Sequence, residues 1–116
     1  MLNYIGYSWI DRGENLDKAL ELVRRAVSQN PRSGAMVDSL GWAYYRLGDF
    51  PRAVTTLEQA VELQPGDPEL NNHLGDAYWR VGRRDEAGFQ WKRVLTLDPD
   101  PKIRAEVERK LAQGLG

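Results

Sequence analysis

The segments "DSLGWAYYRLGDF" (residues 38–50) and "NHLGDAYWRVGRR" (residues 72–84) have nearly the same order of small and aromatic residues. When Leu40 is aligned with Leu74, glycine, alanine, tyrosine, arginine and a second glycine recur in step. Every matched pair is 34 residues apart. A pattern that returns at a fixed interval of this length predicts a repeat protein, in which each copy is one structural unit.

A third copy precedes these two. One proline and one alanine of each copy recur at steps of 34 residues along all three copies: Pro31, Pro65 and Pro99, and Ala19, Ala53 and Ala87. Gly6 and Gly41 are 35 residues apart, because one extra residue lies in the turn at 14–18. Loops accept an insertion at low cost, whereas helix faces do not. The chain is therefore predicted to be one domain, 1–116, with repeats at 1–33, 34–67 and 68–100.

Each repeat is predicted to be a pair of helices. In the second repeat, apolar and small residues from Val37 to Tyr44 recur at i, i+3, i+4 and i+7, which is one face of a helix. Gly48 suits the end of that helix, because glycine tolerates a positive φ. Asp49 is the expected N-cap of the second helix, which closes before Pro65.

One further helix is predicted at 101–113, after the third repeat. Its apolar edge consists of Ile103, Val107 and Leu111, at i, i+4 and i+8. Six of its other positions are polar and are expected to face water: Lys102, Arg104, Glu106, Glu108, Arg109 and Lys110. One apolar edge with a solvated outside is typical of a terminal capping helix. The fold class is therefore all-α, with about seven helices.

Composition argues against several classes of function. Hydrophobic residues make up 41% of the 116 residues, and the net charge of −1 provides no electrostatic footprint for nucleic acid or anionic lipid. No apolar run approaches the roughly 20 residues that span a bilayer. Without cysteine, and with His73 as the single histidine, thiolate and three-histidine metal sites are excluded within the chain. Ser39, His73 and Asp38 are the residue types of a catalytic triad, but polar residues that face a groove are far commoner than a triad. We therefore expect no catalysis and no cofactor.

The repeats resemble the tetratricopeptide repeat (TPR) family, whose unit has 34 residues and a Trp-x2-Leu-Gly-x2-Tyr, Ala, Phe, Ala, Pro pattern. The second copy supplies Leu40, Gly41, Tyr44, Gly48, Ala53, Leu57, Ala60 and Pro65, and the third supplies Leu74, Gly75, Tyr78, Gly82, Ala87, Trp91, Val94 and Pro99. The resemblance covers residues 1–100, although Leu2, Val37 and Asn71 replace the early tryptophan of the pattern. It implies a right-handed superhelical array of antiparallel helix pairs, a solenoid that binds peptide segments.

The resemblance also implies where binding takes place, because the first helix of each repeat lines the concave groove. The residues expected to bind a peptide are Asn3, Tyr7, Asp11, Asp38, Trp42, Tyr45, Arg46, Asn72, His73, Asp76, Trp79 and Arg80. Aromatic side chains supply contact area at low entropy cost, while arginine and aspartate supply directed hydrogen bonds. In the alternative interpretation, Tyr45 and Trp79 pack against adjacent helices and the charges are only solvated.

The expected partner is a protein or peptide segment rather than a chaperone tail. TPR domains that grip the carboxylate tails of chaperones use a clamp of basic and asparagine side chains, which corresponds here to Asn3, Tyr7, Ser39, Glu69 and His73. None of these is lysine or arginine, and Glu69 would repel an anionic tail. The acidic groove residues Asp11, Asp38, Glu69 and Asp76 favour a basic or amide-rich ligand, an effect that Arg46 and Arg80 temper.

The sequence therefore predicts a non-catalytic interaction scaffold, without nucleic-acid binding or membrane insertion, similar to TPR segments of bacterial multi-repeat proteins. Two alternatives stay open. In the family frame the chain begins inside a helix, so Leu2 and Ile5 are expected to be unshielded, as in a fragment of a longer array. An unshielded N-terminal face with Leu2 and Ile5 predicts that the chain associates with other copies of itself. The repeats can equally be a passive spacer in a larger protein.

Overall fold

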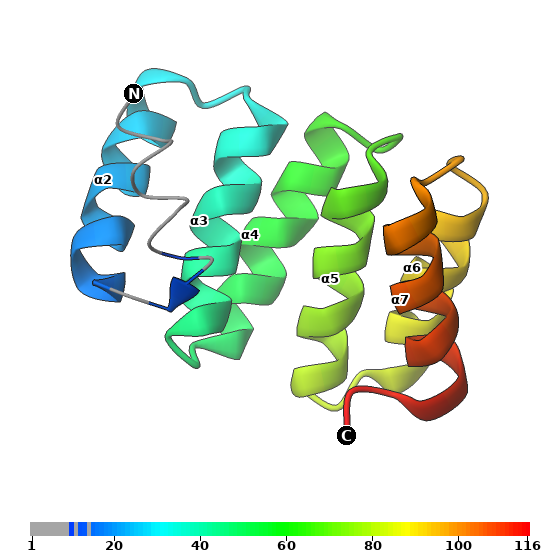
Figure 1. Ribbon diagram of the computed structural model, residues 1–116. Coiled ribbons are helices and arrows are strands. Elements are labelled where there is room, and N and C mark those ends of the chain that lie inside the picture. Colours follow the sequence, from blue (N-terminus) through cyan, green and yellow to red (C-terminus); the bar gives the residue numbers. More distant parts are fainter. Residues whose placement is uncertain (1–9, 11, 14) are drawn as a thin grey trace.

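The computed structural model describes residues 10, 12, 13 and 15–116, and these form a row of six helices (Figure 1). The helices are α2 (Leu16–Gln29), α3 (Gly34–Arg46), α4 (Phe50–Leu63), α5 (Pro68–Arg80), α6 (Arg84–Leu95) and α7 (Pro101–Gln113). The described part of the chain contains no strand, and the predicted all-α solenoid is confirmed. The expected number of about seven helices is close to the six described.

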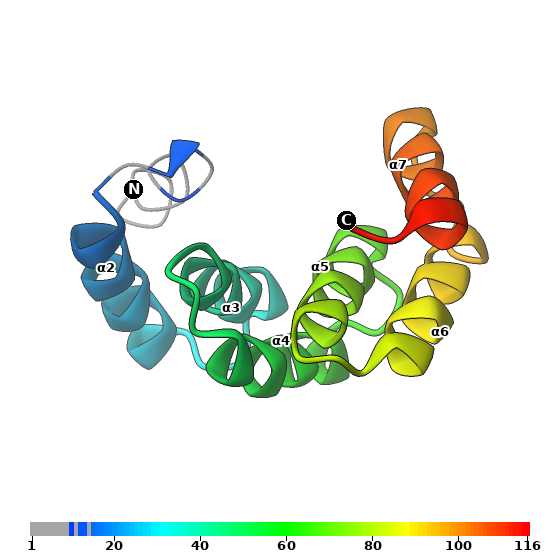
Figure 2. The same ribbon diagram turned by 90° about the horizontal axis from the view of Figure 1, so that it is seen from below.

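The row is curved, and its inner side is built from every second helix. Each helix packs against the next one along the chain, from α2 to α7. In addition α3 contacts α5 and α5 contacts α7, so these three helices share one side of the array. Seen from below, α3 and α5 lie on the inner side of the arc, while α4 lies on its outer side (Figure 2). We call the side formed by α3, α5 and α7 the concave face.

Local sequence signals set the ends of the helices. Asp49 caps α4 by accepting a hydrogen bond from the backbone N–H of Arg52, and Asp67 caps α5 in the same way. Gly48 and Gly82 follow α3 and α5 with the same φ of 84°, a conformation that other residues rarely adopt. The predicted cap at Asp49 and the predicted end at Gly48 are therefore confirmed.

Two glycines allow the paired helices to approach each other closely. On α3, a Cβ atom added to Gly41 would lie 2.6 Å from Cγ of Leu57 on α4. On α5, a Cβ atom added to Gly75 would lie 2.5 Å from Nε1 of Trp91 on α6. Leu57 and Trp91 are 0% and 1% exposed, so neither has room to move aside. The same close contact thus builds both helix pairs.

Two tyrosines connect one pair to the next. Tyr44 on α3 accepts a hydrogen bond of 3.0 Å from Arg24 on α2. At the equivalent place in the next repeat, Tyr78 on α5 donates a bond of 2.6 Å to Glu58 on α4. Each partner lies 20 residues before its tyrosine, so the two hydroxyls are bonded at the same point of each junction. Tyr44 accepts its hydrogen bond and Tyr78 donates one, but the two bonds lie at equivalent positions.

Replacing Gly41 by alanine is expected to destabilise the protein. The added methyl group would overlap Leu57, and overpacking of this kind costs about 1–3 kcal/mol, which exceeds the gain of about 1 kcal/mol in helix propensity. Gly88 provides a matched control, since it lies inside α6 and a Cβ atom there meets nothing within 4 Å. Thermal unfolding should give a lower midpoint for Gly41→Ala and a higher one for Gly88→Ala. Equal gains in both variants would contradict the close-packing argument.

Candidate functional site

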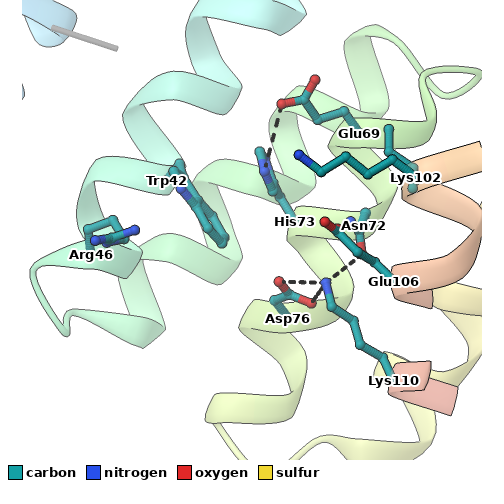
Figure 3. A pocket seen from close by; sticks show the side chains of 10 residues that line it. Trp42, Arg46, Glu69, Asn72, His73, Asp76, Lys102, Glu106 and Lys110 are labelled. Atoms are coloured by element: carbon teal, nitrogen blue, oxygen red, sulfur yellow. Dashed lines mark hydrogen bonds and ion pairs between the residues drawn. The ribbon is translucent and has the colours of Figure 1, made fainter. Parts of the chain in front are cut away.

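A pocket of about 360 Å³ opens on the concave face between α3, α5 and α7 (Figure 3). Five of the predicted groove residues line it: Trp42, Arg46, Asn72, His73 and Asp76. Glu69, which was predicted to repel an anionic tail, lines it as well. The third helix of the pocket is α7, which contributes Lys102, Ile103, Glu106 and Lys110. The sequence predicts only a capping role for α7, so the contribution of α7 to the pocket is a finding of the structure.

His73 joins α5 to α3 at the wall of this pocket. Its Nδ1 lies 2.8 Å from Oδ1 of Asp38, which is only 3% exposed. The indole of Trp42 stacks on the imidazole, with ring centres 4.1 Å apart and an angle of 16° between the planes. Burial disfavours the charged imidazole, but the carboxylates of Asp38, Glu69 and Asp76 outweigh burial and raise the pKa of His73.

A second contact joins α3 to α5 two helical turns further along. Tyr45 stacks on Trp42, with ring centres 4.3 Å apart and an angle of 8°. Nε of Arg80 on α5 donates a hydrogen bond of 3.1 Å to the Tyr45 hydroxyl. Burial, opposed by this bond from Arg80, raises the pKa of Tyr45. Tyr45 and Arg80 therefore hold adjacent helices together, as the alternative interpretation of the sequence proposed for Tyr45.

Lys110 is buried, and the expectation that it faces water is wrong. It is 8% exposed, and its ammonium group donates to Oδ1 of Asp76 and Oδ1 of Asn72, both at 2.9 Å (Figure 3). Asp76 also accepts a bond of 3.1 Å from Nε1 of Trp91. The physical reason lies in the helical period, since Lys110 is seven residues after Ile103 and shares its face. The spacing of seven residues between Ile103 and Lys110 could have indicated from the sequence that Lys110 is buried.

Trp79 lies away from the pocket and packs against other parts of the chain. Its ring centre is 5.7 Å from that of Trp91, and the guanidinium of Arg84 sits 4.3 Å above it. Gly114, after the end of α7, lies against the far edge of the same ring. Trp79 thus has the structural role that the alternative interpretation described. The predicted residues Asn3, Tyr7 and Asp11 lie outside the described residues.

The site does not bring Ser39 and His73 together as a nucleophile and its base. The Ser39 hydroxyl donates to the carbonyl of Ala35 at 3.1 Å, along its own helix, and Ser39 is 3% exposed. The described residues hold no group of three or more histidine, cysteine, aspartate or glutamate side chains suited to a metal ion. No helix within 15–116 has the length and apolar character needed to cross a membrane.

Comparison with known proteins gives two family matches. One model, described as TPR repeat, matches residues 41–82, and another, described as tetratricopeptide repeat, matches residues 68–101. Together they span just over half of the 116 residues. A TPR repeat-containing protein of Pseudomonas aeruginosa is 40% identical over 58 residues, which are 50% of this chain and 10% of that protein. The chain thus spans about a tenth of the length of this relative.

Solved structures share the fold at low sequence identity. The first TPR of Spaghetti (RPAP3), bound to an HSP90 peptide, aligns with a TM-score of 0.83 and 24% identity, covering 98% of this chain and 90% of that one. The second TPR domain of human RPAP3, in complex with an HSP70 peptide, gives 0.80 and 20%, covering 97% and 92%. The Yersinia enterocolitica type III secretion translocator chaperone SycD gives 0.85 and 15%, covering 96% and 86%.

Replacement of Lys110 by methionine is expected to cost about 3–5 kcal/mol, because Asp76 would keep a buried charge without its cation. Adding Asp76→Asn should recover much of this loss, since the amide removes the charge and can still accept from Trp91. Lys102→Met, on the exposed side of α7, serves as the control and should change the unfolding free energy by less than about 0.5 kcal/mol. Equal effects of the two lysine variants in urea unfolding would contradict the buried pair.

The raised pKa of His73 predicts a pH-dependent stability. A group with a raised folded pKa stabilises the native state below its unfolded pKa, about 6.5, and loses that contribution as the pH rises through the folded value. As the pH rises from about 6.5 through the folded pKa of His73, the free energy of unfolding of wild type should therefore fall relative to that of Asp38→Asn. Because His73 is the single histidine, its imidazole proton signals can be titrated by NMR without ambiguity. A midpoint at or below the ordinary value would contradict the pairing with Asp38.

Proposed function

Because the chain belongs to the tetratricopeptide repeat (TPR) family, we propose that it is an interaction scaffold that binds a peptide segment of a partner protein on its concave face. The observation that carries the proposal is the pocket between α3, α5 and α7. Its walls come from three packed helices, so little ordering is needed when a ligand enters. Preorganisation of this kind lowers the entropic cost of binding.

The chemistry of the pocket suits a polypeptide ligand. Asn72 and Lys102 can donate hydrogen bonds, Glu69 and Glu106 can accept them, and Trp42 adds an aromatic surface. A volume of about 360 Å³ is near the lower end of the range for ligand pockets, about 300–1,000 Å³. This space fits one or two side chains of an extended segment better than a folded element.

Solved proteins of the same fold hold peptides, as the RPAP3 domain does with an HSP90 peptide. In this chain the ligand is proposed to differ from an acidic chaperone tail. Glu69 lines the pocket with a carboxylate at the position of a clamp residue, and Ser39, at another such position, is buried. An anionic tail would meet repulsion at the first and no accessible group at the second.

Self-association through the N-terminal face is the rival function. It depends on Leu2 and Ile5, which lie outside the described residues, so it stays a prediction from the sequence. A passive spacer would bind neither a peptide nor a second copy of the chain. The experiment that tests the proposal includes a measurement of mass, which separates self-association from peptide binding.

Peptides are selected from a random library on the immobilised protein, and their binding is expected to depend on the residues that line the pocket. Trp42→Ala, and the milder Ile103→Ala, should each weaken the selected peptides by about tenfold or more, which is the loss of a well-buried contact worth 1.4 kcal/mol or more. Affinity is measured by fluorescence polarisation with labelled peptides, and circular dichroism establishes that both variants are folded.

Phe89→Ala is the control, because Phe89 lies on α6, outside the pocket lining, and is 66% exposed. If this change abolishes binding while the pocket variants do not, the site is on the outer surface. If no peptide is enriched, the peptide-binding proposal is wrong. Light-scattering mass that rises with concentration, and falls after Leu2→Lys with Ile5→Lys, would then support self-association.

A further inference from the structure

We propose that the side-chain amide nitrogen of Asn72, which lines the pocket, donates a hydrogen bond to an amide carbonyl oxygen of the bound segment. This inference rests on the proposed function and names the group of the ligand that the pocket recognises. The carbonyl belongs either to the backbone of the segment or to one of its asparagine or glutamine side chains, two sources of the same chemistry.

The orientation of the Asn72 amide is fixed by its contact with α7. Lys110 donates a hydrogen bond of 2.9 Å to Oδ1 of Asn72. An ammonium group can only donate, so the oxygen of the amide, and not its nitrogen, must face Lys110. The ammonium group is itself held by the carboxylate of Asp76, with contacts of 2.9 and 3.1 Å. Nδ2 of Asn72 therefore points away from Lys110.

That nitrogen is a buried donor without an acceptor. Asn72 is 5% exposed, and its Nδ2 makes no hydrogen bond with any residue of the described part of the chain. Burial of an amide donor without an acceptor costs free energy, and folded proteins keep few such groups. In Figure 3, Asn72 lies among the side chains that line the pocket, and a dashed line joins it to Lys110. An acceptor that enters the pocket would satisfy this donor.

The preceding residue shows how a structural asparagine is used in this fold. Nδ2 of Asn71 donates to the carbonyl oxygens of Pro65 and Asp67, at 3.1 and 2.8 Å. Its Oδ1 accepts a hydrogen bond of 3.1 Å from Gln90 on α6. Asn71 is fully buried and is not among the residues that line the pocket. The two neighbours have the same side chain and similar burial, but only Asn72, at the pocket, leaves its amide hydrogens unused.

A neutral acceptor suits this donor better than a charged group. The pocket lining contains three carboxylates and three lysine or arginine side chains, so their charges balance. The ammonium group that contacts Asn72, that of Lys110, is already paired with Asp76. An anion at Nδ2 would therefore gain little from Lys110, and a cation would offer Nδ2 no lone pair. An amide carbonyl provides a strong acceptor without net charge.

The first part of the test compares the thermal unfolding of two leucine variants. Asn71→Leu removes the donor from two backbone carbonyls, so its unfolding midpoint should fall sharply. Asn72→Leu removes a donor that has no acceptor and leaves Lys110 paired with Asp76, so its midpoint should change much less. Equal losses in the two variants would show that the Asn72 amide stabilises the fold, which would overturn the inference.

The second part measures the affinity of peptides selected from a random library on the full chain. Asn72→Leu should weaken them by about tenfold or more, because their carbonyl loses its donor. Asn72→Asp should do the same, since it keeps an oxygen toward Lys110 and replaces the amide donor by a second acceptor. Gln59→Leu is the matched control, because it removes an exposed amide on α4 that is not part of the pocket lining.

The accepting carbonyl is then identified by changing the peptide. Each backbone amide is replaced by an ester, whose carbonyl is a weaker acceptor, and each asparagine or glutamine is replaced by leucine. A change that weakens binding to wild type, but not to Asn72→Leu, marks the oxygen that Asn72 contacts. Coupling to an ester identifies the backbone as the source, and coupling to a leucine replacement identifies a side-chain amide. If no change is coupled to Asn72, the inference is wrong.

The outcomes separate this inference from the proposed function. Peptides that need Trp42 but bind Asn72→Leu as tightly as wild type would overturn the inference and leave the peptide groove intact. Peptides whose coupled acceptor is a carboxylate would overturn the assignment of a neutral carbonyl. A failure to enrich any peptide would overturn both the proposed function and the inference.

Discussion

The close contacts of Gly41 with Leu57 and of Gly75 with Trp91 set the spacing of the helix pairs from which the array is built. Each brings two helices so near that a single added carbon atom would overlap a buried side chain. Because the contact recurs in successive repeats, α3 with α4 and α5 with α6 form equivalent pairs. The first helices of these pairs then face the same side. A concave surface built from the first helices follows from this repetition.

That surface has two parts with different roles. Between α3 and α5, the polar and aromatic side chains are engaged with each other, through Asp38 with His73 and through Tyr45 with Arg80. Stacking on Trp42 connects these two contacts into one continuous set. Between α5 and α7, by contrast, the amide nitrogen of Asn72 has no acceptor among the described residues. The first part holds the curvature of the array, and the second leaves a hydrogen-bond donor available at the pocket.

The sequence predicts the fold well because the fold is periodic. Repeat length, capping aspartates and helix-ending glycines are local signals, and each recurs, so chance agreement is improbable at every copy. The candidate site is harder, because a one-dimensional pattern places a residue on a face without choosing its partner. Both contacts between α3 and α5 join residues 35 apart, one more than the repeat length. This interval could have indicated that Asp38 and Arg80 serve the array itself, but side-chain orientation was needed to establish it.

Lys110 shows why the terminal helix could not be understood from its polarity alone. It lies on the apolar side of α7, where Val107 is fully buried, and reaches Asp76 and Asn72 on α5. A rotation of α7 about its axis would leave two buried charges without partners, at a cost of several kcal/mol. An apolar side chain at this position would pack, but would not distinguish one rotation from another. The ion pair therefore selects the single setting of α7 that turns Ile103 and Glu106 toward the pocket, so the same residue that closes the array also completes its concave face.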